Sequence, residues 1–121
     1  MTKHLVYVAY GWLTCTGVLH FAIDVISQHV RGKRTPSPET TLYYGLHSAF
    51  AIGQVLFGLL VLWLAWRNRE IATATPVVAL SLVAAAGWLA ITVRFMEYWE
   101  PKFNVIVFAA LVVIAALFGR R

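Results

Sequence analysis

Charged side chains are scarce in this sequence. Only 12% of its 121 residues are Asp, Glu, Lys or Arg, and 60% are hydrophobic, whereas a soluble domain carries about 25% charged residues. Such a composition predicts an integral membrane protein rather than a globular soluble one. The length allows one domain, residues 1–121, built from four spans of about 20 residues with short connections.

Cysteine is nearly absent, and several motifs are missing. Cys15 is the only cysteine, which excludes an intramolecular disulfide and a thiolate metal cluster. The sequence contains no P-loop, no nucleophile elbow and no HExxH or paired ExxH spacing, so it predicts no bound cofactor or metal. The net charge of +5 comes from basic residues that border the apolar segments. We therefore expect them to meet anionic membrane lipid and not nucleic acid.

Four apolar segments predict an all-α, antiparallel four-helix transmembrane bundle. The spans are expected at residues 5–29, 38–66, 75–98 and 103–118. Ser37 as a cap and Pro38 at the first helical position mark the start of the second span. Residues 100–102 are expected to form the turn that connects the third span to the fourth. The fourth span then has sixteen residues without an ionisable side chain, and we expect it to face lipid or a partner and to thin the bilayer locally.

Small residues in the second span predict a close contact with another helix. His47, Ala51, Gln54 and Gly58 share one face of this segment. A polar stripe interleaved with small residues is typical of helix packing in membranes. We expect both Gly53 and Gly58 to lie where another helix crosses closely.

Ionisable residues within the spans gather in one half of the predicted bundle. Five of them, proposed as the catalytic group, are His20, Asp24, His47, Arg94 and Glu97. Such residues are costly in a membrane and usually face the interior or a wet cavity. His20 and Asp24 stand four apart, so they can touch on one helix face. A short hairpin loop places His47 opposite them.

These residue types suit acid–base chemistry. A carboxylate one turn from a histidine orients the imidazole and raises its basicity. Arg94 could hold an anionic group or stabilise an oxyanion. The expected ligand contacts are Tyr10, Tyr44, Gln54 and Tyr98. Simpler explanations exist for each: solvation at the interface for Asp24, Arg94 and Glu97, backbone hydrogen bonds for the histidines, and an interhelical hydrogen bond for Gln54.

Three functions remain open on this basis. The first is a small membrane enzyme of isomerase or hydrolase type, or a binding protein, for a lipophilic small molecule that enters from the bilayer. The second is an accessory subunit of a larger membrane complex or a homo-oligomer, in which the polar groups only fix helix register. The third is proton or metal-ion handling, with His20, Asp24, His47 and Glu97 as nitrogen and oxygen donors, or a haem held between His20 and His47.

The second span also resembles a known pattern. Gly45, Gly53 and Phe57-Gly58 are similar in spacing to the second helix of small uncharacterised bacterial four-span inner-membrane proteins. That resemblance covers residues 45–58 and implies a bacterial inner-membrane protein without assigning an activity. Where that family has a Ser-His pair, this chain has Ala49-Phe50, and its histidine comes earlier, at His47.

An even number of spans places both termini on one side of the membrane. Five Lys and Arg residues lie on that side. Four lie on the other when Arg94 is assigned to the site rather than to a loop. The positive-inside rule then predicts cytoplasmic termini by a difference of one residue.

Overall fold

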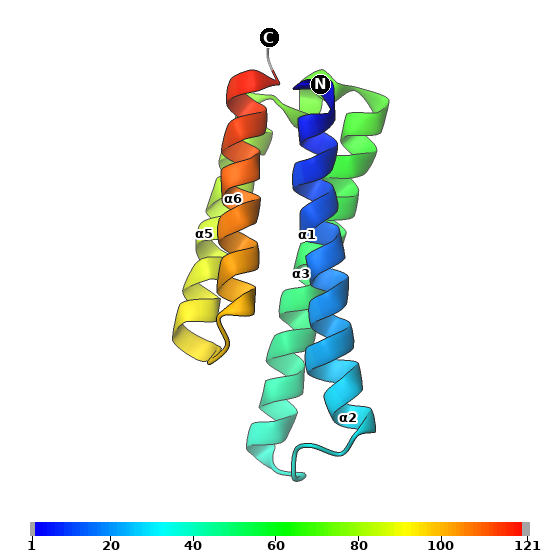
Figure 1. The fold of residues 1–121 in the computed structure, drawn as a ribbon, viewed down its shortest axis with the longest axis vertical. Coiled ribbons are helices and arrows are strands. Elements are labelled where there is room, and N and C mark those ends of the chain that lie inside the picture. The colour runs from blue at the N-terminus through cyan, green and yellow to red at the C-terminus, as the bar shows by residue number, and fades with distance from the viewer. Residues whose placement is uncertain (1, 120–121) are drawn as a thin grey trace.

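The computed structural model describes residues 2–119, all of whose regular elements are helical. Four helices are long: α1 (Leu5–Phe21), α3 (Pro38–Arg67), α5 (Thr75–Phe95) and α6 (Glu100–Phe118). The short elements are η1 (Thr2–His4), the π-helix η2 (Ala22–Ser27), α2 (Gln28–Val30) and α4 (Arg69–Ala72). Figure 1 shows the long helices side by side, with the described ends of the chain at the same end of the molecule. The predicted all-α bundle is therefore confirmed.

All four expected spans are long and apolar enough to cross a membrane. The first is continuous from Leu5 to Val30, because η2 and α2 extend α1. The α1–α3 hairpin projects beyond the α5–α6 pair at one end (Figure 1). There Ser37 caps α3 as predicted, accepting a hydrogen bond from the backbone N–H of Thr40 at 3.1 Å. With 30 residues, α3 is about 45 Å long and must extend past the roughly 30 Å hydrocarbon layer.

The core lies between α1, α3 and α6, which corrects the expected place of the fourth helix. α6 packs against both α1 and α5 and buries Val105, Phe108 and Val112. The more peripheral helix is α5. Within a membrane both lipid-facing and core positions are apolar, so hydropathy does not show which helix is central.

The turn between α5 and α6 is also displaced from its expected position. α5 ends at Phe95 rather than near residue 98, and α6 begins at Glu100 rather than Phe103. The reason is that Pro101 occupies the first turn of α6, a position where its missing N–H costs nothing. The fourth span thus has 19 residues, or about 28 Å, and needs no local thinning of the bilayer. Its first turn also carries two ionisable side chains, Glu100 and Lys102.

Of the two glycines predicted at a close crossing, only Gly58 lies at one. A Cβ at Gly58 would overlap the hydroxyl oxygen of Thr14 and lie 3.1 Å from the carbonyl oxygen of Tyr10, both on α1. A Cβ at Gly53 would find only the indole nitrogen of Trp88, at 3.8 Å. The second close approach is at Gly17, where a Cβ would lie 2.9 Å from Val55. Both tight contacts belong to the α1–α3 pair.

Candidate functional site

The π-helix η2 places three polar residues along one side of the first span. His20, Asp24 and Gln28 stand four apart, and in an α-helix such a row drifts around the axis by about 40° per step. A π turn closes i→i+5 hydrogen bonds and holds more residues, which reduces this drift. All three residues line one cavity. π-helical turns occur often at functional sites. The sequence contains no evident signal for this one, so it was not predicted.

Asp24, His20 and His47 form a continuous chain of contacts, which we call the His–Asp–His group. The Nδ1 atom of His20 lies 2.9 Å from a carboxylate oxygen of Asp24. Its Nε2 atom lies 2.8 Å from Nδ1 of His47. His20 and His47 are only 7% and 2% exposed. The predicted contact between His20 and Asp24, and the predicted position of His47 opposite them, are both present.

Aromatic and polar side chains cover this group toward the 31–37 loop. The ring of Tyr43 lies 4.1 Å from the ring of His47, and the guanidinium of Arg34 lies 3.3 Å above Tyr43. Gln28 donates from Nε2 to the Tyr43 hydroxyl and accepts from Nε of Arg34, each at 3.0 Å. Gln28 and Arg34 were not expected in the site from the sequence. The spacing of four residues between Asp24 and Gln28 could have indicated Gln28.

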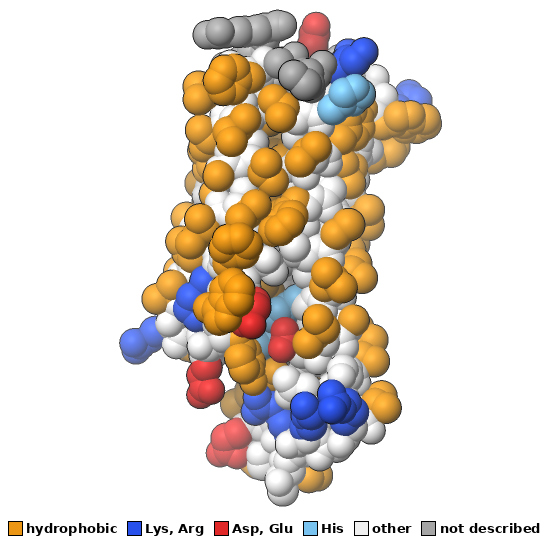
Figure 2. Space-filling view, in the orientation of Figure 1, with side chains coloured by type: hydrophobic (Ala, Val, Ile, Leu, Met, Phe, Trp, Pro, Cys, Tyr) orange, Lys and Arg blue, Asp and Glu red, His pale blue; other side chains and the backbone are white. Residues whose placement is uncertain are grey.

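A cavity of about 480 Å³ opens beside His20 and Asp24, between the first span and the start of α6. Its lining is Thr16, Leu19, His20, Ile23, Asp24, Gln28, Tyr98, Glu100, Pro101 and Asn104. Figure 2 shows the corresponding hollow, with histidine between acidic side chains and apolar surface above it. Lys and Arg are absent from the lining that the structure describes. Glu100 was missed from sequence because the last helix was expected to begin after it, at Phe103, whereas α6 begins at Glu100. Asn104 lay inside the expected helix and was not assigned to the site.

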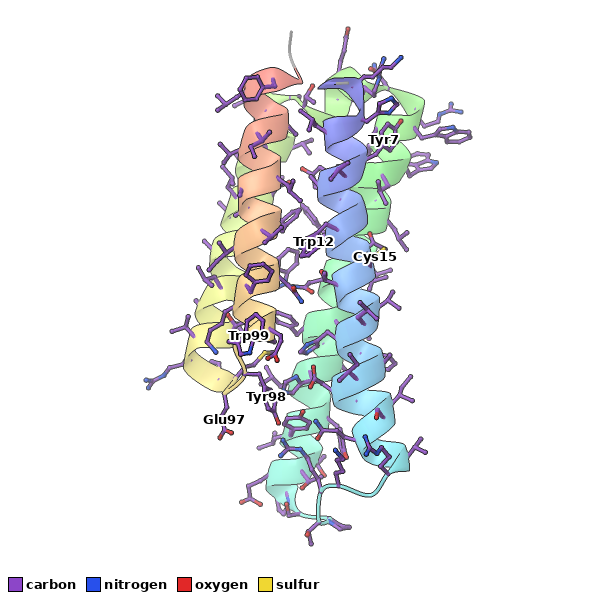
Figure 3. The ribbon with its side chains drawn as sticks, in the orientation of Figure 1. Tyr7, Trp12, Cys15, Glu97, Tyr98 and Trp99 are labelled. Carbon is purple, nitrogen blue, oxygen red and sulfur yellow. The ribbon has the colours of Figure 1, made fainter. Side chains whose placement is uncertain are left out.

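Arg94 and Glu97 are not brought to this cavity. Both side chains are exposed, because α5 ends at Phe95 and Met96 continues in an extended conformation. Figure 3 shows Glu97 pointing away from the bundle, while Tyr98 points toward the α1–α3 hairpin. Tyr98 alone of the four expected ligand contacts lines the cavity.

The other three expected ligand contacts lie elsewhere in the bundle. Tyr10 is in the core, where its hydroxyl is 2.7 Å from that of Ser81 and its ring packs on Phe108. Tyr44 packs edge-on against His29, with ring centroids 5.6 Å apart. Gln54 is buried on α3, at 2% exposure, away from the cavity.

Lys102 holds the far wall of the cavity in place. Its ammonium donates to the carbonyl oxygens of Met96 at 2.8 Å and Tyr98 at 2.7 Å. Lys102→Met keeps the apolar stem and removes both bonds, so we expect the free energy of unfolding to fall by about 1 kcal/mol. Thermal unfolding in detergent would measure this loss. Lys3→Met, at the opposite end of the chain, is the control, and equal losses in the two variants would contradict the role of Lys102.

The group supports two kinds of chemistry. An ionised Asp24 only accepts hydrogen bonds, so it fixes the proton of His20 on Nδ1 and leaves Nε2 to accept from His47. Such an oriented imidazole suits general acid–base catalysis. One ligand atom from each of the three residues can also be chosen so that all lie within 4.8 Å of one another. A haem between the two histidines does not fit this arrangement. Their bonded nitrogens are 2.8 Å apart, whereas two imidazole nitrogens on opposite sides of one metal ion, each at about 2 Å from it, are about 4 Å apart.

Comparison of the chain with protein-family profiles, with curated proteins and with solved structures finds no significant match. The molecule is an all-α bundle with four helices apolar enough to span a membrane, and it carries a buried His–Asp–His group beside an open cavity.

Proposed function

We propose that this chain is a membrane protein that binds a lipophilic molecule, with the polar end of that molecule at His20 and Asp24. The observation that carries the proposal is that these two residues line a cavity of about 480 Å³ while hydrogen bonding connects them to His47 behind it. Leu19 and Ile23 supply apolar lining, and Glu100 and Asn104 supply polar lining opposite. A pocket with a few polar groups among apolar ones is typical of small-molecule sites.

Proton transfer is the reaction class that this site favours, in an enzyme of isomerase or hydrolase type. Asp24 is the group that would give or take a proton at the ligand, because it lines the cavity while both ring nitrogens of His20 are already bonded. His20 would pass the proton on through its ring, exchanging with Asp24 at Nδ1 and with His47 at Nε2. The same contacts would serve a binding protein without turnover.

Filling the cavity should displace the ligand. Leu19 lines the cavity and is 57% exposed, so Leu19→Trp can fill space there without overpacking the core. After purification in mild detergent, mass spectrometry of an organic extract should show a compound enriched with the wild-type chain. We expect its amount per protein to fall at least about tenfold in Leu19→Trp, a loss of about 1.4 kcal/mol of binding.

The matched control is Leu80→Trp, on a 62% exposed position of α5. This variant should keep the wild-type amount of the compound. Equal amounts in all three proteins, or no compound above the detergent blank, would contradict the binding proposal. Either result would favour the accessory-subunit alternative, in which the polar group fixes helix register.

The proposed location is the bacterial inner membrane, with cytoplasmic termini. The four apolar spans support a multi-pass protein. The resemblance of residues 45–58 and the small excess of basic residues on the terminal side support the membrane and the orientation. In this orientation the His–Asp–His group lies in the half of the bundle away from the cytoplasm, and labelling of single cysteines in the 31–37 loop of intact cells would test it.

A further inference from the structure

The His–Asp–His group has the donor set and the spacing of a transition-metal site. Imidazole nitrogen with one carboxylate oxygen suits Zn²⁺ and related divalent ions. Zn²⁺ holds these atoms at about 2.0–2.2 Å, so the ligand atoms of one tetrahedral ion are about 3.3 Å apart. Here one ligand atom from each of the three residues can be chosen so that all three lie within 4.8 Å of one another. The two short contacts use different ring nitrogens of His20, Nδ1 at 2.9 Å from Asp24 and Nε2 at 2.8 Å from His47. Side-chain rotations would therefore have to bring one of these nitrogens, with the other two ligand atoms, around one ion.

The charges around the group favour a cation as well. The cavity that His20 and Asp24 line also receives the side chain of Glu100, and no basic side chain contributes to its described lining. The nearest cation that the contacts identify is Arg34, and the ring of Tyr43 separates it from His47. A divalent ion bound to one carboxylate and two neutral imidazoles keeps one positive charge, which the carboxylate of Glu100 can offset across the cavity.

We propose that His20, Asp24 and His47 bind one divalent transition-metal ion of the Zn²⁺ type, with a remaining coordination position open to the cavity. Three protein ligands and an open position are the arrangement of catalytic rather than structural zinc sites. The three protein ligands are a carboxylate oxygen of Asp24 and one ring nitrogen from each histidine. The proposal goes beyond ligand binding in the cavity and does not depend on it, because it concerns only these three side chains.

The test is a metal titration of the full chain in detergent after treatment with EDTA and its removal. Competition with a chromophoric chelator gives the Zn²⁺ affinity and stoichiometry, and Co²⁺ in place of Zn²⁺ gives the visible absorption of a low-symmetry site. We expect one ion per chain, with bands typical of tetrahedral Co²⁺. Binding should weaken as pH falls, because the imidazoles must be unprotonated to bind.

Two ligand variants and one control identify the residues. His47→Gln should weaken Zn²⁺ binding by about 100-fold or more, and Asp24→Asn by at least about tenfold. His29→Gln removes an exposed histidine at the same end of the bundle and should bind as the wild type does. Circular dichroism of each variant monitors folding. No lipophilic ligand is added in the titration and its readout is metal binding alone, so its outcome is distinguishable from that of the cavity-filling test.

Several results would overturn the metal site. One is a wild-type chain that binds no stoichiometric Zn²⁺ and shows no tetrahedral Co²⁺ bands; the group would then be a metal-free proton relay. Another is unchanged affinity in both His47→Gln and Asp24→Asn. A third is equal weakening in His29→Gln, which would indicate adventitious binding by surface histidines. If one ligand variant does not fold, the other variant and the Co²⁺ spectrum of the wild type still decide.

Discussion

Replacing Gly58 with leucine is expected to lower the free energy of unfolding by about 1–3 kcal/mol. The first atom of the new side chain would already overlap the hydroxyl oxygen of Thr14. That hydroxyl cannot move freely, because it donates to the carbonyl oxygen of Tyr10 at 2.8 Å. The backbone nitrogen of Thr14 would be only 3.2 Å away, so relief requires α1 and α3 to separate. Reversible unfolding of the purified protein in mixed detergents would measure the change.

Gly53→Leu is the matched control for this variant. It lies on the same helix, yet a Cβ there has nothing closer than 3.8 Å, so we expect little change in stability. Gly17→Leu should destabilise the protein as Gly58→Leu does. Gly17 lies on α1, and a Cβ there would lie 2.9 Å from Val55 on α3, so this substitution overpacks the same helix pair. Equal destabilisation by Gly53→Leu and Gly58→Leu would show that loss of a helical glycine, rather than overpacking between α1 and α3, causes the effect.

Local signals in the sequence predicted most of the fold. Spans follow from hydropathy, and the start of α3 follows from Ser37 and Pro38, whose capping geometry is present. The contact between His20 and Asp24 follows from helical spacing alone. Its connection to His47 needs only the α1–α3 hairpin, which the short loop favours.

Features that depend on tertiary packing could not be predicted in the same way. Arg94 was expected in the site because the third helix was extended to residue 98, whereas it stops at Phe95. This end is set by Pro101 and by Lys102, which bonds the carbonyls of Met96 and Tyr98. Gly53 and Gly58 look equivalent in sequence, and only the crossing of α1 distinguishes them. The π-helix around Asp24 has no local sequence signal that we can identify.

The second large effect is expected at Asp24. Asp24→Asn keeps the shape of the side chain and removes the charge that bonds Nδ1 of His20 at 2.9 Å. Hydrogen bonds to charged groups contribute about 1.5–3 kcal/mol, and Asp24 is largely buried, with 15% of its side chain exposed. We therefore expect the metal-free protein to lose stability in this range while remaining folded, and to lose the lipophilic compound that co-purifies with the wild type. Reversible unfolding and the extraction measurement report the two effects separately.

A double-mutant cycle with His47→Gln tests whether the three residues act as one unit. Asp24 and His47 are linked through His20. The effects of the two substitutions on the free energy of unfolding should therefore be non-additive, with a coupling energy of at least about 0.5 kcal/mol. The control pair is Asp24→Asn with Thr73→Ala, at the other end of the bundle, and it should be additive.

Nitrogen NMR of labelled histidine rings provides a second measurement of the same coupling. In the wild type the ionised carboxylate of Asp24 should hold the protons of His20 and His47 on Nδ1. The side-chain amide introduced by Asp24→Asn can donate or accept, so it should release the rings into a mixture of tautomers. Additive energies together with unchanged ring signals would mean that Asp24 and the two histidines are neighbours without a shared role, and would remove the basis for acid–base chemistry at this site.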